Sequence, residues 1–354
     1  MAKINFNTTV SIDECASIIE ATGAEVTNII ISEPGVGKSS ILKLLEERMG
    51  DGYDYIYVDC PVKDMMDVAA SIPNHESKSL EYYVSDLFKM DSGKPKVIML
   101  DEFMKAPKLL QVIFTRLMLE RTVGDRALPV GSMVFGTSNN TTDGVGDSML
   151  SHAGNRVCKL YMRKPTADEW NAWAGVNGVP RPIRAWVAMN SRALASYMDG
   201  DQDDNPYIFK PGIQTQFVSP RSLFLSGSYL RNKNKITSNA LTAGLTGTLG
   251  EAAAKSMAAF VQLEDKLIRF DEIIAAPERV AVPEDVSALI MMMFEATDSI
   301  KGQDDLTKYM QFVNRIRNTE VQAVFFTMMI RNKPRVARYN QAITKWAADN
   351  HYVL

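Results

Sequence analysis

The chain has 354 residues, of which 46% are hydrophobic and 23% are charged, and its formal net charge is −3. These values are ordinary for a soluble globular protein, and the length suggests two or three domains that each bury a core. A net charge this close to zero excludes a global electrostatic attraction to DNA or RNA. Two short basic clusters occur at 231–235 and 331–338, and we interpret both as solvated surface.

Cysteine and histidine are too scattered to predict a zinc site or a histidine-based catalytic triad. The cysteines Cys15, Cys60 and Cys158 lie far apart in the sequence, without a Cys-x-x-Cys pair, and the three histidines are also isolated. We therefore expect reduced thiols in the core of a cytosolic protein. Because no signal peptide and no long apolar run is recognisable, we expect a cytoplasmic location.

The first recognisable elements surround a tight loop. Apolar residues at helical spacing predict a helix within 9–22. A β-branched apolar run predicts a strand at 26–31, and a loop with one proline and two glycines follows at 32–38. An amphipathic helix is expected at 41–49.

A strand, a glycine-containing loop and a helix in this order are the context of a phosphate-binding P-loop. Backbone N–H groups of the loop and the positive end of the helix would face the phosphates of ATP. Lys38 would reach the β- and γ-phosphates, and the hydroxyl of Ser39 would bind Mg²⁺. The residues expected to contact the nucleotide are Glu33, Pro34, Gly35, Val36, Gly37, Lys38, Ser39 and Ser40. Ser32 stands where the motif has its first glycine, and a serine fits there only at negative φ, so this change bears on nucleotide affinity.

The segment after this helix is harder to interpret. Alternating β-formers predict a strand at 53–59. Apolar residues at 65–71 and at 80–88 suggest two short helices, with a polar break at 73–77.

The next strand, at 97–102, ends in two acids. Its apolar run is typical of a buried parallel strand, and Asp101 and Glu102 stand at its carboxyl end. In a P-loop ATPase, an aspartate at the tip of a strand beside the P-loop holds Mg²⁺ and its waters. An adjacent glutamate can act as the general base for the attacking water. This pair therefore predicts hydrolysis of ATP as well as binding.

The remaining segment up to residue 163 continues the alternation of helices and strands. In chain order we expect a helix with an apolar stripe of Leu109, Ile113 and Leu117, a hairpin at 120–128, a strand at 132–137, a helix near 147–153 and a strand at 157–162. This alternation predicts an α/β fold with a parallel sheet over 1–163. Asn139 follows the strand at 132–137, where its amide can orient the attacking water.

From residue 164 onward the pattern is helical. Thr166 and Glu169 have the spacing of a capping box, and Ser219 followed by Pro220 predicts a second helix start. Three consecutive methionines at 291–293 are expected to fill a core. We divide this part into a helical lid at 164–262 and a helical C-terminal extension at 263–354.

The order of these motifs resembles that of the AAA+ ATPases and, within them, the MoxR type. The matching segments are 33–39 as Walker A, 100–102 as Walker B, 118–121 with its hairpin, 135–139 as sensor 1, 155–157 before the last strand and 219–221 as sensor 2. Residues 225–354 look like versions of this ATPase that bacteria and their tailed phages carry. The resemblance implies a P-loop AAA+ sheet domain with a helical lid, with ATP and Mg²⁺ as cofactors. For a phage-encoded chain it implies the cytoplasm of the bacterial host.

The family also implies roles for arginines. Arg156 would be an arginine finger that reaches the nucleotide of the neighbouring subunit, and nearby Arg163 is the alternative. Such a finger contributes on the order of 10³–10⁵ in rate. Arg221, in the first turn of a helix, would contact the γ-phosphate in cis. Because a finger that acts in trans requires a ring, the resemblance implies a homohexamer.

The function that we predict is Mg²⁺-dependent ATP hydrolysis by a MoxR-like ring that remodels or assembles a protein partner. In this family the partner is often a protein with a von Willebrand factor A domain, and we expect neither nucleic acid nor a membrane. The alternative is an AAA+ nucleic-acid motor or loader that acts on DNA, for which the two basic clusters are the support. A third reading is a nucleotide-locked scaffold with slow turnover, which Ser32 leaves open.

Overall fold

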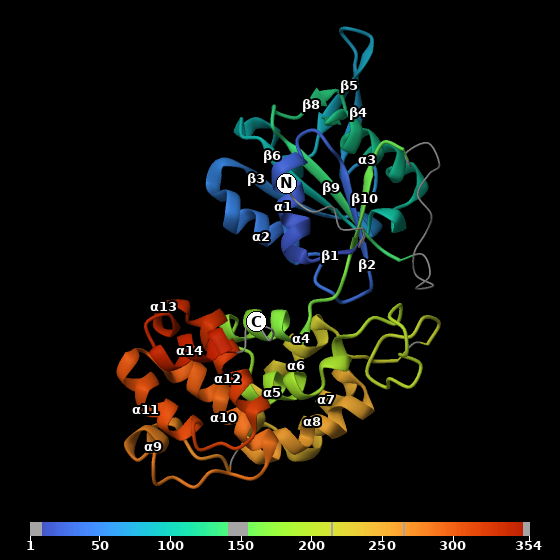
Figure 1. The fold of residues 1–354 in the computed structure, drawn as a ribbon. Helices are drawn as coiled ribbons and strands as arrows, with labels where there is room; N and C mark the ends of the chain where they lie inside the picture. The colour runs from blue at the N-terminus through green and yellow to red at the C-terminus, as the bar shows by residue number, and fades with distance from the viewer. Residues whose placement is uncertain (1–8, 141–154, 214, 265, 350–354) are drawn as a thin grey trace. The chain divides into compact units, whose positions relative to one another are not determined.

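The computed structural model describes residues 9–140, 155–213, 215–264 and 266–349. The chain divides into two compact units (Figure 1). The first comprises Met1–Lys164 with Lys210–Ile213, and the second comprises Pro165–Phe209 with Gln214–Leu354.

The first unit is built on a six-stranded sheet in which every pairing is parallel. Its strands are β1 (Thr9–Val10), β2 (Asn28–Ser32), β3 (Asp54–Asp59), β6 (Lys96–Asp101), β9 (Met133–Asn139) and β10 (Cys158–Met162). Their spatial order is β1-β10-β2-β9-β6-β3. In this order β9, which ends in Asn139, lies between β2, which leads into the P-loop, and β6, which ends in Asp101. All the carboxyl ends meet at one edge, where open α/β sheets bind their ligands.

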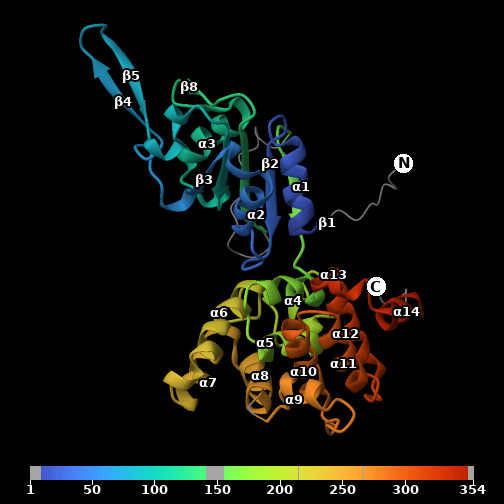
Figure 2. The same ribbon diagram turned by 90° about the vertical axis from the view of Figure 1, so that its left-hand side faces the viewer.

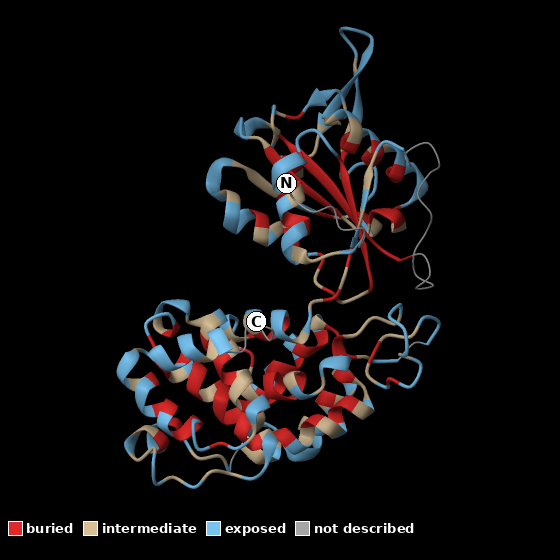
Figure 3. Ribbon diagram, in the orientation of Figure 1, coloured by how far each residue is buried: buried red, intermediate tan, exposed pale blue. Residues whose placement is uncertain are grey.

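Helices cover both faces of this sheet. Helices α1 (Ile12–Thr22) and α2 (Ser40–Met49) share one hydrophobic cluster with one face, and α3 (Lys108–Glu120) shares another cluster with the opposite face. Ile30 faces the first cluster, whereas Ile29 and Ile31 face the second. Burial on both faces explains why the central strands read as continuous apolar runs. Figure 3 shows these buried strands between helices whose outer surfaces are exposed.

The segment that we expected to form two helices is instead an antiparallel hairpin of β4 (Ala69–Asn74) and β5 (Ser79–Val84). The polar break is the turn of this hairpin. There the Asn74 side chain accepts hydrogen bonds from the backbone N–H groups of Glu76 and Ser77. Figure 2 shows the hairpin extending away from the rest of the first unit.

The apolar stripe predicted for α3 is correct at Leu117 and at Ile113, which is partly buried against the same cluster, but wrong at Leu109. Leu110, Phe114 and Leu117 are buried, whereas Leu109 is 58% exposed, so its place in the stripe was wrong.

The predicted hairpin is confirmed as β7 (Thr122–Val123) and β8 (Arg126–Ala127). The helix predicted near 147–153 lies outside the described residues.

The second unit is helical. Its α-helices are α4 (Ala167–Val176), α5 (Arg181–Met189), α6 (Pro220–Arg231), α7 (Ser238–Leu249), α8 (Glu251–Glu264), α9 (Phe270–Ala275), α10 (Val286–Ser299), α11 (Gln303–Val313), α12 (Thr319–Asn332), α13 (Pro334–Ala337) and α14 (Gln341–Asp349). Short 3₁₀ turns occur in the two units at Gly50–Gly52, Cys60–Val62, Asp86–Phe88, Met90–Ser92, Phe103–Lys105, Ser191–Leu194 and Lys233–Lys235. Among the described residues, no helix is long and apolar enough to span a bilayer.

The helix starts predicted in this unit are confirmed. The side chain of Thr166 accepts from the backbone of Glu169, whose carboxylate accepts in return, and Ser219 caps α6 ahead of Pro220. One hydrophobic cluster runs through the unit, and the three methionines at 291–293 are buried in it, as predicted.

Candidate functional site

The loop between β2 and α2 has the backbone geometry that its glycines were expected to provide. Gly35 has φ 75° and Gly37 has φ 110°, a region that side-chain-bearing residues rarely adopt. Ser32 is the last residue of β2 and is not among the described residues with positive φ. Its backbone therefore accommodates a serine without strain, which removes the conformational objection to this residue.

Lys38 is held inside the loop in this structure. Its side chain is buried, and its Nζ donates to the carbonyl (3.2 Å) and the hydroxyl (3.0 Å) of Ser32 and to the carbonyl of Glu33 (3.1 Å). It also donates to Asn139 Oδ1 at 2.8 Å.

The Glu33 carboxylate forms an ion pair with Lys164 at 2.7 Å, and both side chains are 3% exposed. This pair ties the loop to the segment that follows β10.

Asp101 is held at both of its carboxylate oxygens. Oδ2 accepts a hydrogen bond from the hydroxyl of Tyr57 on β3 at 2.7 Å, and Oδ1 accepts from the hydroxyl of Thr137 on β9. Partial burial and the hydrogen bond to Asp101 raise the pKa of Tyr57 above its usual range, although 45% of the residue is exposed. The ordinary pKa of a tyrosine, about 10, already makes the phenol a donor at neutral pH.

The backbone of Glu102 adopts an unusual conformation. It has φ 50° and ψ 37°, in the left-handed region that non-glycine residues seldom occupy. Its N–H donates to the hydroxyl of Thr137 at 3.2 Å, and its carboxylate forms an ion pair with Lys105 at 2.8 Å. Asn139 Nδ2 donates to the other carboxylate oxygen at 3.5 Å, a long contact.

Asn139 lies between the loop lysine and the acidic pair. Its amide oxygen accepts from Lys38 and its amide nitrogen faces Glu102. This arrangement follows from the sheet order, because β9 is the strand between β2 and β6. The structure thus brings together Ser32, Lys38, Asp101, Glu102 and Asn139 in one cluster.

Two of the predicted arginines flank β10, and the third lies in the second unit. Arg156 is exposed, in a turn before β10. Arg163 follows β10 and its guanidinium donates to the carbonyl of Lys164 at 3.0 Å. Arg221 is exposed in the first turn of α6, in the second unit. Their predicted roles stay predictions.

The donor chemistry of the cluster fits Mg²⁺. In the described part of the chain, no group of three or more histidine, cysteine, aspartate or glutamate side chains could hold a metal by itself. Mg²⁺ does not need such a cage, because it usually binds one or two protein oxygens together with phosphates and water. Ser39 is an exposed residue, and Asp101 keeps unused lone pairs on both oxygens.

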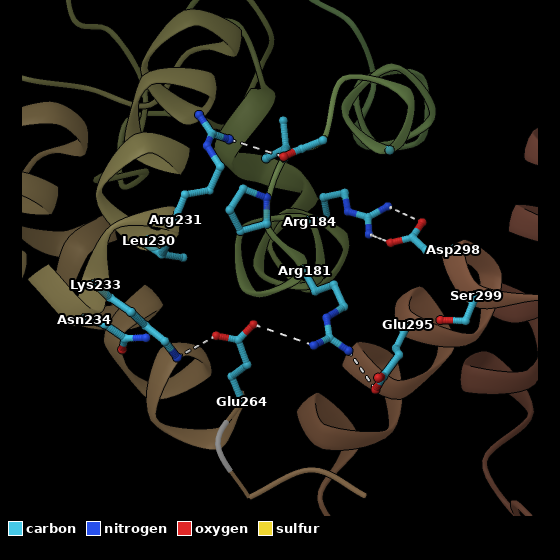
Figure 4. Close-up of a pocket in the computed structure, with 14 residues that line it drawn as sticks. Arg181, Arg184, Leu230, Arg231, Lys233, Asn234, Glu264, Glu295, Asp298 and Ser299 are labelled. Carbon is cyan, nitrogen blue, oxygen red and sulfur yellow. Dashed lines mark hydrogen bonds and ion pairs between the residues drawn. The ribbon is translucent and has the colours of Figure 1, made fainter. Parts of the chain in front are cut away.

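A polar cavity of about 570 Å³ occurs in the second unit and contains none of the predicted site residues (Figure 4). Arg181 forms ion pairs with Glu264 at 3.9 Å and Glu295 at 2.7 Å, and Arg184 pairs with Asp298. Each carboxylate that lines the cavity is thus matched by a cation. We interpret the cavity as the open centre of an ion-pair network that ties α5 to α8 and α10.

Three kinds of comparison set this chain against known proteins. No protein-family model matches the sequence, and no curated protein matches it. Among solved structures, a protein from Cytophaga hutchinsonii that is classed provisionally as an ATPase aligns over 96% of this chain and 89% of its own, with 15% identity and a TM-score of 0.33. The RuvB Holliday junction branch migration motor of Thermotoga maritima aligns over 76% of this chain and 75% of its own, with 13% identity and a TM-score of 0.38.

The fold assignment therefore rests on the chain's own geometry. The first unit has a parallel sheet, a P-loop after β2, acids at the end of β6 and an amide at the end of the strand between them. These features define an α/β P-loop fold. The helical second unit agrees with the helical part that the sequence predicted. The predicted fold class is confirmed.

Proposed function

We propose that this protein is a Mg²⁺-dependent ATP hydrolase. One observation carries the proposal: Asn139 contacts Lys38 on one side and Glu102 on the other. A phosphate-binding lysine and a carboxylate thus flank one amide, an arrangement that suits an amide orienting the water that attacks a γ-phosphate.

The residues take distinct roles in this reaction. The loop backbone and Lys38 bind the β- and γ-phosphates, and Asn139 orients the attacking water. Glu102 accepts the proton of that water as its oxygen bonds to the γ-phosphorus, while the bond to the ADP oxygen breaks. Mg²⁺, held by Ser39 and Asp101 with phosphate oxygens and water, would neutralise charge on the phosphates.

The substitution Glu102→Gln tests the general base. We expect hydrolysis to fall by about 10²- to 10⁴-fold, the range that general base catalysis contributes, while ATP still binds. Steady-state phosphate release and equilibrium binding of ATP measure the two effects. Glu47→Gln, the same change at an exposed residue of α2, is the matched control and should keep the parental rate. If Glu102→Gln turns over like the parent, Glu102 is not the base.

The finer part of the proposal is a MoxR-type AAA+ ring of bacterial or phage origin, with Arg156 acting in trans. Its support is the order of six motifs along the sequence and the exposure of Arg156. We propose a homohexamer that uses ATP to remodel a protein client, such as one with a von Willebrand factor A domain.

The second candidate function is a motor that acts on DNA. Its support is the two basic clusters at 231–235 and 331–338. Several of their cations form contacts within the protein. Lys233 pairs with Glu264 at 2.9 Å, Arg331 pairs with Asp168 at 3.3 Å, and Lys333 donates to backbone carbonyls. Stimulation of ATP hydrolysis by DNA at low salt would promote this function, and the absence of any effect would retire it.

A further inference from the structure

We propose that Tyr57 is a positioning residue that holds the Asp101 carboxylate in the orientation needed for Mg²⁺. The inference rests on the proposed function, in which Asp101 is a metal ligand. Sequence motifs did not point to Tyr57, because it lies on another strand, 44 positions before Asp101.

The contact follows from the pairing of β3 with β6. In this parallel register Tyr57 is opposite Met99, so the long phenol side chain reaches past its partner to Asp101, at the end of β6. Its hydroxyl donates to Oδ2 at 2.7 Å, while Thr137 donates to Oδ1 from the strand on the other side. Two donors on opposite sides prevent rotation of the carboxylate.

A fixed carboxylate matters because Mg²⁺ demands nearly ideal octahedral geometry at 2.0–2.1 Å. An ionised carboxylate has about four lone-pair positions, so the two hydrogen bonds leave positions free for the metal or its waters. In the described part of the chain no lysine or arginine pairs with Asp101, so neutral donors set its orientation. Loss of a donor behind a metal ligand typically weakens metal binding by about 10- to 100-fold.

The test is Tyr57→Phe, which keeps the ring and removes the hydroxyl. Mn²⁺, a paramagnetic substitute for Mg²⁺, is titrated into the protein–ADP complex, and electron paramagnetic resonance measures the free metal. We expect Mn²⁺ to bind about tenfold more weakly than in the parent, with ADP binding unchanged without metal. With Mg²⁺ and ATP, the half-saturating metal concentration should rise while the rate at saturating Mg²⁺ is retained.

Tyr55→Phe is the matched control. Tyr55 lies two residues earlier on the same strand and face, but its hydroxyl donates to the carbonyl of Gly50 at 2.8 Å. This variant should bind Mn²⁺ like the parent. Thr137→Val, which removes the donor at the other oxygen of Asp101, should weaken Mn²⁺ as Tyr57→Phe does.

Asp101→Ala separates the two levels of the inference. If this variant binds Mn²⁺ like the parent, the metal assignment within the proposed function is wrong. If Asp101→Ala weakens Mn²⁺ but Tyr57→Phe stays within twofold of the parent, only the role of Tyr57 is overturned. Tighter binding in Tyr57→Phe would also overturn it.

Discussion

Ser32 contributes two of the acceptors that hold Lys38. Its hydroxyl and its carbonyl both accept hydrogen bonds from Lys38. A lysine that binds β- and γ-phosphates must leave these partners when ATP arrives. The hydroxyl of Ser32 therefore holds the lysine by a contact that a glycine could not make.

We predict that Ser32→Ala tightens ATP binding. A single hydrogen bond contributes about 0.5–1.5 kcal/mol, so loss of the hydroxyl from the free state should lower the Kd for ATP by about two- to tenfold. Isothermal titration calorimetry measures this change. Ser17→Ala, which removes a serine hydroxyl on α1 outside the site, should leave the Kd unchanged. Weaker binding in Ser32→Ala would mean that the hydroxyl favours the nucleotide-bound loop instead.

The site residues that the sequence revealed are those whose signal is local. Lys38 stands in a loop motif, and Asp101 and Glu102 end an apolar run. Tyr57 and Thr137 were missed because their contacts with Asp101 arise from strand pairing across 44 and 36 positions. Lys105 was missed although it follows Glu102 by only three residues, a separation within reach of an ion pair.

At the scale of elements, the secondary structure was predicted wrongly where residues are exposed, because no buried face gives the apolar residues a strand or helix period. Most residues of β4 and β5 are exposed, so no buried face imposes the period of two that marks a strand. In α3, helical spacing fits a stripe through Leu109 as well as the one through Leu110. Only packing against the sheet selects between them. The central strands, buried on both faces, were predicted correctly.

Helix α7 contains two glycines in different surroundings, Gly244 and Gly247, and we predict different responses to alanine. Gly247 has nothing within 4 Å of the position that a Cβ would take. There alanine should stabilise by about 1 kcal/mol, the difference in helix propensity. At Gly244 a Cβ would lie 2.6 Å from the Tyr229 ring of α6, so the ring would have to move. Gly244→Ala should therefore lose that gain or destabilise.

Thermal or denaturant unfolding of the two variants measures the difference, and each serves as the control for the other. Both substitutions have the same intrinsic helix propensity, so the difference reports the packing of α7 on α6. Equal stabilisation by the two alanines would show that Tyr229 moves aside at no cost.

At the scale of the whole molecule, the proposed ring depends on Arg156. Arg156 is exposed and lies at the start of β10, whereas the guanidinium of Arg163 already donates to a backbone carbonyl. An exposed guanidinium at this end of the sheet is available to reach another subunit. We therefore favour Arg156 over Arg163 as the finger in the proposed assembly.

We predict that Arg156→Ala lowers kcat by about 10³-fold or more without loss of ATP binding, because a finger neutralises charge only in the transition state. The sharper experiment mixes Arg156→Ala with Glu102→Gln subunits, each nearly inactive alone. In a mixed ring, a nucleotide on an Arg156→Ala subunit has its own Glu102 and can receive Arg156 from its neighbour, so activity returns. An arginine that acts in cis gives no recovery in any mixture. The same mixture with Arg163→Ala separates the two candidates, because only the variant of the true finger can be complemented in this way.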